Sequence, residues 1–226
     1  MKSALYLVST PIGNYDDITL RAIKVLSEVD VLVCEEYKEA RRLLSHLKIQ
    51  NQNLLSLNEH NENEKAAEIL GLIKQGKSAA LFSDCGTPVF SDPGLRLSKL
   101  CIDNKIEVIP VPGVSSLLTA LTGAGINIDN FYYAGWISPK TEIRFKELNK
   151  LKQKHELLVF METPYRLKKI ISDIRKTFGN SVYSVLAYEL TTENEKFYRG
   201  TISDIENIVL EKNLKGEFVL LIDNRK

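Results

Sequence analysis

The chain has 226 residues, 44% of them hydrophobic and 26% charged, which is an ordinary globular composition and enough for one large domain or two small ones. Its 30 basic and 29 acidic side chains give a formal net charge of +1, so the overall basic signature of most nucleic-acid-binding domains is absent. No window approaches the ~18 consecutive apolar residues of a membrane helix, and a strand pattern begins at once. We therefore expect a cytoplasmic protein with no secretory signal and no membrane partner.

The first half of the chain alternates between two hydrophobic patterns. Short apolar runs predict strands at 4–9, 29–34, 53–57, 79–83 and 106–110. Helical spacing of apolar residues predicts helices near 19–28, 38–48, 62–75 and 94–104. This alternation predicts a parallel sheet with helices on both faces.

The second half has a different order. A helix near 114–124 is followed by predicted strands near 131–136, 156–161, 182–190, 195–200 and 217–223, and by helices near 141–153, 164–177 and 202–212. Strands that follow one another directly, as 182–190 and 195–200 do, indicate a mixed sheet. We therefore predict two α/β domains, 1–113 with a parallel sheet and 114–226 with a mixed sheet, packed around a shared cleft.

Three loops rich in Gly and Pro follow predicted strands: Thr10–Asn14, Ser83–Gly94 and Pro110–Ser116. Ligands of open α/β sheets bind at the carboxyl ends of strands, and Gly and Pro fix a backbone that can approach a ligand closely. Asp84 adds a charged group that needs a partner after a buried strand. The loops predict a small-molecule site built largely from main chain, although ordinary strand-to-helix turns have similar compositions.

The three loops read T-P-I-G-N, S-D-x-G-T-P-x-x-S-D-P-G and P-x-P-G-x-S-S, and in this order and spacing they resemble the tetrapyrrole methylase superfamily. Further segments resemble one branch of it, the 2′-O-ribose methyltransferases that act on a cytidine of small-subunit (16S) ribosomal RNA. These are Asn58–Glu62, Glu162–Leu167, Tyr188–Thr191 and Lys215–Val219, and the opening loop Thr10–Asn14 resembles the same branch. The resemblance covers nearly the whole chain, and it implies the tetrapyrrole methylase fold and a homodimer.

The resemblance also implies that S-adenosylmethionine binds, folded, in the cleft between the two domains. The residues that correspond to cofactor contacts fall into three groups. One wall is expected from Pro11, Ser83, Asp84, Gly86 and Thr87, a second from Ser115 and Ser116, and the adenine contacts from Phe160, Met161, Tyr188, Gly216 and Glu217. Plain core packing is an alternative role for Met161.

Transfer to a ribose hydroxyl needs activation, because the hydroxyl is a poor nucleophile until it loses its proton. A carboxylate or a histidine can act as a general base, and a cation can stabilise the developing oxyanion. The candidates in the resembling segments are Glu35, Glu36, Glu59, His60, Glu162 and Arg166. Glu36 can equally be an acid in the first turn of a helix, and His60 a capping or core residue.

The substrate is the least determined part of this hypothesis. The stretch from Lys140 to Lys154 contains six basic and two acidic residues, which fits either an RNA-binding surface or a solvated helix face. Glu36 stands where the branch usually has Asp, and Tyr165 stands where it usually has His. A ribosomal RNA or small-ribosomal-subunit substrate is therefore the leading interpretation. A small-molecule (tetrapyrrole-type) methyltransferase and a non-catalytic cofactor-binding relative are the alternatives.

Neither a metal site nor a nucleotide-phosphate loop is predicted. The three cysteines, Cys34, Cys85 and Cys101, show no C-x-x-C spacing, which predicts reduced thiols. The segment Gly71–Ser78 matches the P-loop pattern G-x-x-x-x-G-K-[ST], but it ends a predicted helix instead of opening one. Gly76 is therefore expected to end that helix.

Overall fold

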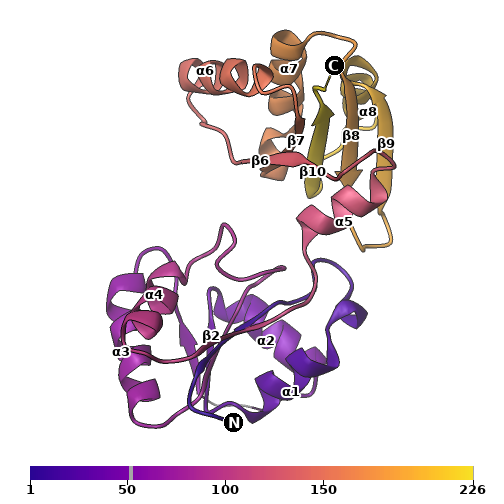
Figure 1. The fold of residues 1–226 in the computed structure, drawn as a ribbon. Helices are drawn as coiled ribbons and strands as arrows, with labels where there is room; N and C mark the ends of the chain where they lie inside the picture. Colours follow the sequence, from indigo (N-terminus) through magenta and orange to yellow (C-terminus); the bar gives the residue numbers. More distant parts are fainter. Residues whose placement is uncertain (51–52, 226) are drawn as a thin grey trace. The chain divides into compact units, whose positions relative to one another are not determined.

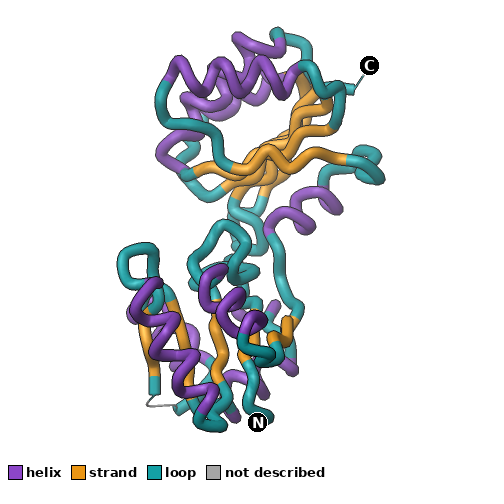
Figure 2. The backbone as a smooth tube through the Cα atoms, turned by 60° about the vertical axis from the view of Figure 1, so that its left-hand side comes forward, coloured by secondary structure: helices purple, strands orange, loops and turns teal. Residues whose placement is uncertain are grey.

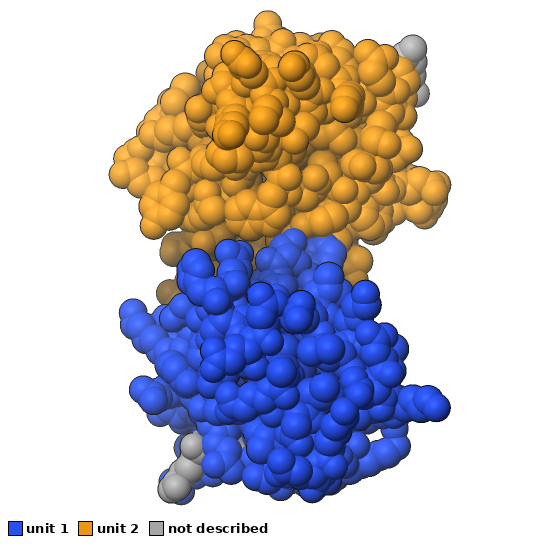
Figure 3. All heavy atoms as spheres, turned by 90° about the vertical axis from the view of Figure 1, so that its left-hand side faces the viewer, with its two compact units in different colours: residues 1–115 blue, residues 116–226 orange. Residues whose placement is uncertain are grey.

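A computed structural model describes residues 1–50 and 53–225 of the chain (Figure 1). The chain divides into two compact units, Met1–Ser115 and Ser116–Lys226, which Figure 3 distinguishes by colour. Each unit has its own sheet, and the buried apolar clusters of one unit include no residue of the other.

The first unit is built on five parallel strands in the order β3-β2-β4-β1-β5. They are β1 (Leu5–Val8), β2 (Val31–Cys34), β3 (Leu54–Ser56), β4 (Ala79–Phe82) and β5 (Val108–Val111). The helices are α1 (Leu20–Glu28), α2 (Tyr37–His46), α3 (Glu62–Lys74) and α4 (Leu95–Asp103), with a short 3₁₀ turn, η1 (Tyr15–Asp17). The predicted parallel sheet and its strand positions are confirmed.

Side chains alternate between the two faces of the sheet along each strand, so this unit has two hydrophobic cores, one on each face. Tyr6 and Val8 of β1 pack with α1 and α2 on one face of the sheet, whereas Leu5 packs with α3 and α4 on the other. Successive side chains of a strand point to opposite faces, so each parallel strand needs apolar residues on both sides. This explains the uninterrupted apolar runs that mark the strands in the sequence.

The second unit has a mixed sheet in the order β6-β7-β10-β8-β9, with β6 parallel to β7 and the other neighbours antiparallel. Its strands are β6 (Phe131–Gly135), β7 (Leu157–Glu162), β8 (Tyr183–Tyr188), β9 (Lys196–Thr201) and β10 (Phe218–Asp223). Its helices are α5 (Ser116–Gly123), α6 (Thr141–Lys152), α7 (Leu167–Phe178) and α8 (Ile202–Glu211), with the turn η2 (Pro164–Arg166). The predicted mixed sheet is confirmed.

Three of these helices share one face of the mixed sheet. Apolar side chains of α6, α7 and α8 form a single core with β7, β8 and β10, whereas α5 lies on the other face and contacts β10 (Figure 2). Ile137, in the loop after β6, is buried in this same core.

The structure agrees with the rejection of a P-loop at Gly71–Ser78. This segment ends α3, and Gly76 has a left-handed backbone with φ of +91°. The amino end of a helix, where a phosphate would bind, is therefore not at this position. Among the described residues, no helix is long and apolar enough to cross a membrane.

Candidate functional site

The carboxyl ends of β1 and β4 form a point where the chain leaves the sheet in two directions. After β1 the chain continues to α1, on one face, and after β4 it continues to α4, on the opposite face. The two strands are adjacent and parallel. Adjacent strands whose connections leave to opposite faces create the crevice in which open α/β sheets bind ligands.

The loops after β1 and β4 are joined by hydrogen bonds. The Thr10 amide donates to the Gly86 carbonyl at 2.8 Å, and the Thr10 hydroxyl donates to the Ser83 carbonyl at 2.9 Å. Gly86 has φ of +85°, where a Cβ would lie 3.3 Å from the Ile12 side chain. Thr10 itself is buried, so the T-P-I-G-N motif contributes a structural hydroxyl that sequence reasoning did not single out.

A third loop, after β5, joins the same cluster. The Thr87 hydroxyl donates to the Val114 carbonyl at 3.2 Å. A Cβ at Gly113 would lie only 2.9 Å from that of Ser9, so the backbones of the first and third loops approach too closely for a side chain. The predicted first-unit residues Pro11, Ser83, Asp84, Gly86, Thr87 and Ser115 thus lie on three interlinked loops at one edge of the sheet.

The loop after β4 holds residues in a backbone conformation that L-amino acids rarely adopt. Val89 has φ of +70° and Ser91 has φ of +66°, and a β-branched residue at positive φ is a genuine outlier. The Asp92 carboxylate lies 2.6 Å from the Ser83 hydroxyl and ties the loop back to its start. Strained backbone held by its surroundings is typical of ligand-binding loops.

Three carboxyl groups meet at the ends of β2 and β4. Burial, together with the charges of Asp84 and Asp92, raises the pKa of Glu35 to about 7. Burial also raises the pKa of Asp84 and that of Asp92, while hydrogen bonds from the Glu36 amide and the Ser83 hydroxyl oppose these rises. Glu35 and Asp92 line one small pocket with Ser83. Glu36 is exposed and begins α2 as its N-cap residue.

The segment Asn58–Glu62 supplies exposed groups and one structural contact. Glu59 and His60 are exposed in the turn before α3. Glu62 points elsewhere: its Oε1 accepts from the amides of Gly94 at 2.9 Å and Arg96 at 3.1 Å. A carboxylate at the amino end of a helix stabilises it, so Glu62 caps α4 and anchors the end of the long loop after β4.

The predicted adenine-contacting residues gather at one edge of the second sheet. Phe218 pairs with Glu162 on one side and with Tyr188 on the other, so the end of β7, the end of β8 and the start of β10 share one level. Phe160 is fully buried, Met161 is half-buried and Glu217 is exposed.

The backbone is tightly packed at this edge. The Tyr188 hydroxyl accepts from the Gly216 amide at 2.8 Å. A Cβ at Gly216 would collide with the Glu189 carboxylate, which itself accepts from the Glu217 amide at 2.6 Å. A side chain at position 216 would have to displace the Glu189 carboxylate and the Tyr188 hydroxyl.

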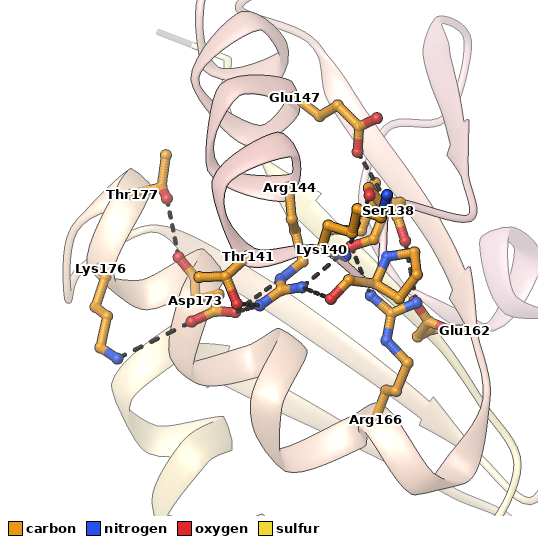
Figure 4. A network of polar contacts seen from close by, with 12 residues as sticks. Ser138, Lys140, Thr141, Arg144, Glu147, Glu162, Arg166, Asp173, Lys176 and Thr177 are labelled. Carbon is orange, nitrogen blue, oxygen red and sulfur yellow. Dashed lines mark hydrogen bonds and ion pairs between the residues drawn. The ribbon is translucent and has the colours of Figure 1, made fainter.

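Two of the predicted catalytic residues pair with each other. Glu162 is buried, and its Oε2 lies 2.6 Å from Nη1 of Arg166 (Figure 4). Burial raises the pKa of the Glu162 carboxyl, and the Thr163 amide and the Arg166 charge oppose that rise. The same guanidinium also donates to the carbonyls of Ile137 and Ser138.

The predicted cofactor residues are divided between the units. Those up to Ser115 belong to the first unit; Ser116, the first residue of α5, belongs to the second, together with Phe160, Met161, Tyr188, Gly216 and Glu217. Within residues 1–50 and 53–225, no three His, Cys, Asp or Glu side chains gather in a way that could hold a metal ion.

The basic stretch from Lys140 to Lys154 is less basic at the surface than in the sequence. Arg144 is 1% exposed, and its guanidinium pairs with Asp173 inside the second unit. The remaining cations of the stretch are exposed lysines, Lys140, Lys146, Lys150, Lys152 and Lys154. Counting Arg144 as a surface charge was wrong, because a charge and its partner that face each other in the interior do not contribute to a binding surface.

Comparison with known proteins agrees with this architecture. The family model for tetrapyrrole (corrin/porphyrin) methylases matches residues 4–206. The chain is 38% identical to "Ribosomal RNA small subunit methyltransferase I" of Synechocystis over 96% of this chain and 78% of that protein. It is also 38% identical to the Bacillus subtilis protein of the same name, over 97% of this chain and 74% of the relative.

Among solved structures, a cobalt precorrin-4 methyltransferase of cobalamin biosynthesis has a TM-score of 0.73 at 17% identity, covering 97% of this chain and 94% of that one. At this identity the likeness shows the fold alone. With the match to the family model and the relatives above 30% identity, it leads to one conclusion. The chain belongs to the tetrapyrrole (corrin/porphyrin) methylase family, in the branch of its ribosomal RNA small subunit methyltransferase I relatives.

Proposed function

We propose that this protein is an S-adenosylmethionine-dependent methyltransferase that methylates the 2′-hydroxyl of a cytidine ribose in small-subunit (16S) ribosomal RNA. The observation that carries the proposal is the 38% identity to the Synechocystis methyltransferase over 96% of this chain. The choice of cytidine and of the ribose hydroxyl rests on the branch motifs in the loops. We further propose that the protein acts in the cytoplasm, as a homodimer.

The residues at the two sheet edges suit this cofactor chemically. When bound, S-adenosylmethionine supplies a methyl group on a sulfonium cation and also carries an ammonium group. Asp84 offers a half-buried carboxylate to a cation, and the interlinked loops around Gly86 offer main-chain groups at close range. At the second edge, the half-buried Tyr188 and Met161 offer an aromatic ring and a thioether to a flat ring.

Glu35 is the candidate best suited to accept the ribose proton. A general base works best with a pKa near the working pH, and the pKa of Glu35 is about 7. It lies at the end of β2, beside the loop after β4. A pH–rate profile tests this role. Activity of the wild type is expected to rise through pH 7, and Glu35→Gln is expected to remove that rise, whereas the exposed Glu28→Gln is expected to keep it.

The function itself is tested by methyl transfer from labelled S-adenosylmethionine. The acceptors are small ribosomal subunits and free ribosomal RNA from cells that lack this gene. Label in one ribose supports the proposal and identifies the nucleotide. Absence of label with both acceptors contradicts it. If calorimetry then shows that the cofactor still binds, a small-molecule methyltransferase and a non-catalytic cofactor-binding relative are the alternatives. Light scattering tests the dimer, which a monomeric mass would refute.

Asp84 gives the assay a matched pair of variants. Asp84→Asn is expected to weaken cofactor binding by about tenfold or more, because a hydrogen bond to a charged group contributes roughly 1.5–3 kcal/mol. Asp103→Asn, at the exposed end of α4, removes the same charge far from the loops and is expected to change nothing. Equal binding by both variants would remove Asp84 from the site.

A further inference from the structure

In the second unit, hydrogen bonds connect the loop after β6 with the loop after β7. β6 and β7 are parallel neighbours, so both loops start at the same edge of the sheet. Arg166, in the loop after β7, donates to the carbonyls of Ile137 at 3.0 Å and Ser138 at 3.1 Å in the loop after β6. Nη1 of Arg166, the nitrogen that donates to Ile137, also forms an ion pair with Oε2 of Glu162 at 2.6 Å (Figure 4).

A second arginine holds the same loop from inside the core. Arg144 donates to the carbonyls of Ser138 at 3.1 Å and Pro139 at 2.7 Å, while its Nε donates to Asp173 at 2.8 Å. Glu147 accepts from the Ser138 amide at 2.8 Å. Burying a guanidinium and a carboxylate costs free energy that their attraction repays only in good geometry. The shape of a short surface loop is therefore maintained at a considerable desolvation cost.

Each of the joined loops presents an aromatic ring to solvent. Trp136 precedes Ile137 and is 51% exposed, and Tyr165 precedes Arg166 and is 97% exposed. Both residues are thus direct chain neighbours of the groups that bridge the loops. The exposed Lys140 is the N-cap residue of α6, four residues after Trp136, and the exposed Lys169 lies in the first turn of α7, four residues after Tyr165.

We propose that Trp136 and Tyr165 form a stacking platform for unpaired bases of the RNA substrate, with Lys140 and Lys169 beside its phosphates. The proposal rests on the function proposed above. Sequence-specific recognition of RNA mostly uses unpaired bases that stack on aromatic rings, and stacking contributes roughly 1–3 kcal/mol per base. Rings on loops that two arginines hold rigid lose little freedom when a base stacks on them. The lysines give the surface the charge that a phosphate backbone requires.

The single tryptophan of the chain allows a direct test. Because Trp136 is the only indole, tryptophan fluorescence reports on this loop alone. Titration with protein-free small-subunit ribosomal RNA, and with a single-stranded RNA oligonucleotide of mixed sequence, is expected to quench the emission to saturation. Tyr165→Ala is expected to raise the RNA concentration at half-quenching about tenfold. Tyr165→Phe, which keeps a stacking ring, is expected to retain the wild-type value.

Methyl-transfer kinetics provide a second readout. Trp136→Ala and Tyr165→Ala are each expected to raise KM for small ribosomal subunits about tenfold, with kcat within twofold and cofactor affinity unchanged. Tyr183→Ala is the matched control, since Tyr183 is 40% exposed at the start of β8, the opposite edge of the same sheet. It is expected to leave KM unchanged.

Other outcomes overturn the platform without overturning the proposed function. One is wild-type methyl transfer with unaltered KM in both alanine variants; another is RNA binding, followed by anisotropy, with no change in tryptophan emission. A loss of mass in light scattering on Trp136→Ala would assign the surface to a second copy of the chain instead.

The opposite outcome is also distinguishable. Absence of methyl transfer by the wild type, with RNA-dependent quenching intact, would overturn the proposed function and leave the platform supported.

Discussion

Nε of Arg144 lies 2.8 Å from Oδ2 of Asp173, and the two residues form a buried ion pair between α6 and α7. The other guanidinium nitrogens of Arg144 donate to the loop after β6 and to the Thr141 hydroxyl. The pair therefore links the packing of two helices to the conformation of a surface loop.

Breaking this pair is expected to be costly. Arg144→Met leaves Asp173 buried without its main partner, and loss of one member of a buried pair costs about 3–5 kcal/mol. Urea unfolding measures the free-energy difference. Arg42→Ala, which removes an exposed pair with Glu39 on α2, serves as the control and is expected to cost less than about 1 kcal/mol. Similar losses in both variants would contradict the role assigned to Arg144.

The helices and strands of this fold were predictable because each follows from the spacing of apolar residues along the sequence. The strand at Ala79–Phe82 is a continuous apolar run, and α3 shows its buried face at Ala66, Ile69 and Ile73. Both patterns are local in sequence. The three loops at the carboxyl ends of strands were likewise visible as Gly- and Pro-rich segments.

Contacts between distant segments were not predictable in the same way. The sequence shows Arg144 as one of several cations, and only the fold reveals Asp173 opposite it. Glu62 belongs to a motif that favoured catalysis, but its carboxylate caps α4, 32 residues further along the chain. The pKa of Glu35 is raised by burial and then by the charges of Asp84 and Asp92, which the order of the strands brings near it. Long-range partners decide each of these roles.

Glycine-to-alanine substitutions are expected to have opposite effects at two positions. At Gly216 the new methyl group displaces the Glu189 carboxylate and weakens its hydrogen bond with the Glu217 amide, at a cost of about 1 kcal/mol, and cofactor affinity is expected to fall. At Gly71, inside α3, a Cβ would meet nothing within 4 Å, so Gly71→Ala is expected to stabilise the protein by about 1 kcal/mol. Thermal unfolding and calorimetry of S-adenosylmethionine binding measure both effects. Destabilisation by Gly71→Ala would contradict the open space at that position.

The raised pKa of Glu35 predicts how stability changes with pH. The folded protein holds a proton on Glu35 up to about pH 7, whereas the unfolded chain releases it near the ordinary value of 4.5. Between these values the native state binds more protons, so this group makes stability fall as pH rises. Denaturant unfolding from pH 4.5 to 8 is expected to show that the free energy of unfolding of Glu35→Gln increases relative to that of the wild type as the pH rises. Glu28→Gln, at the exposed end of α1, is expected to show the same pH dependence of the free energy of unfolding as the wild type. A constant difference between Glu35→Gln and the wild type would refute the shift.

Thiol labelling can report on the loop after β4. Cys85 is exposed in that loop, whereas Cys34 and Cys101 are buried, and burial raises the pKa of their thiols to about 12 and about 11. The thiolate is the reactive form, so a thiol reagent is expected to modify Cys85 alone in the native protein and all three cysteines after denaturation. S-adenosylmethionine is expected to slow the native reaction, because Cys85 lies between Asp84 and Gly86 of the proposed cofactor site. Mass spectrometry of digests identifies the modified residue, and Cys85→Ser controls for slow reaction elsewhere. Unchanged labelling at saturating cofactor would exclude this loop from the binding site.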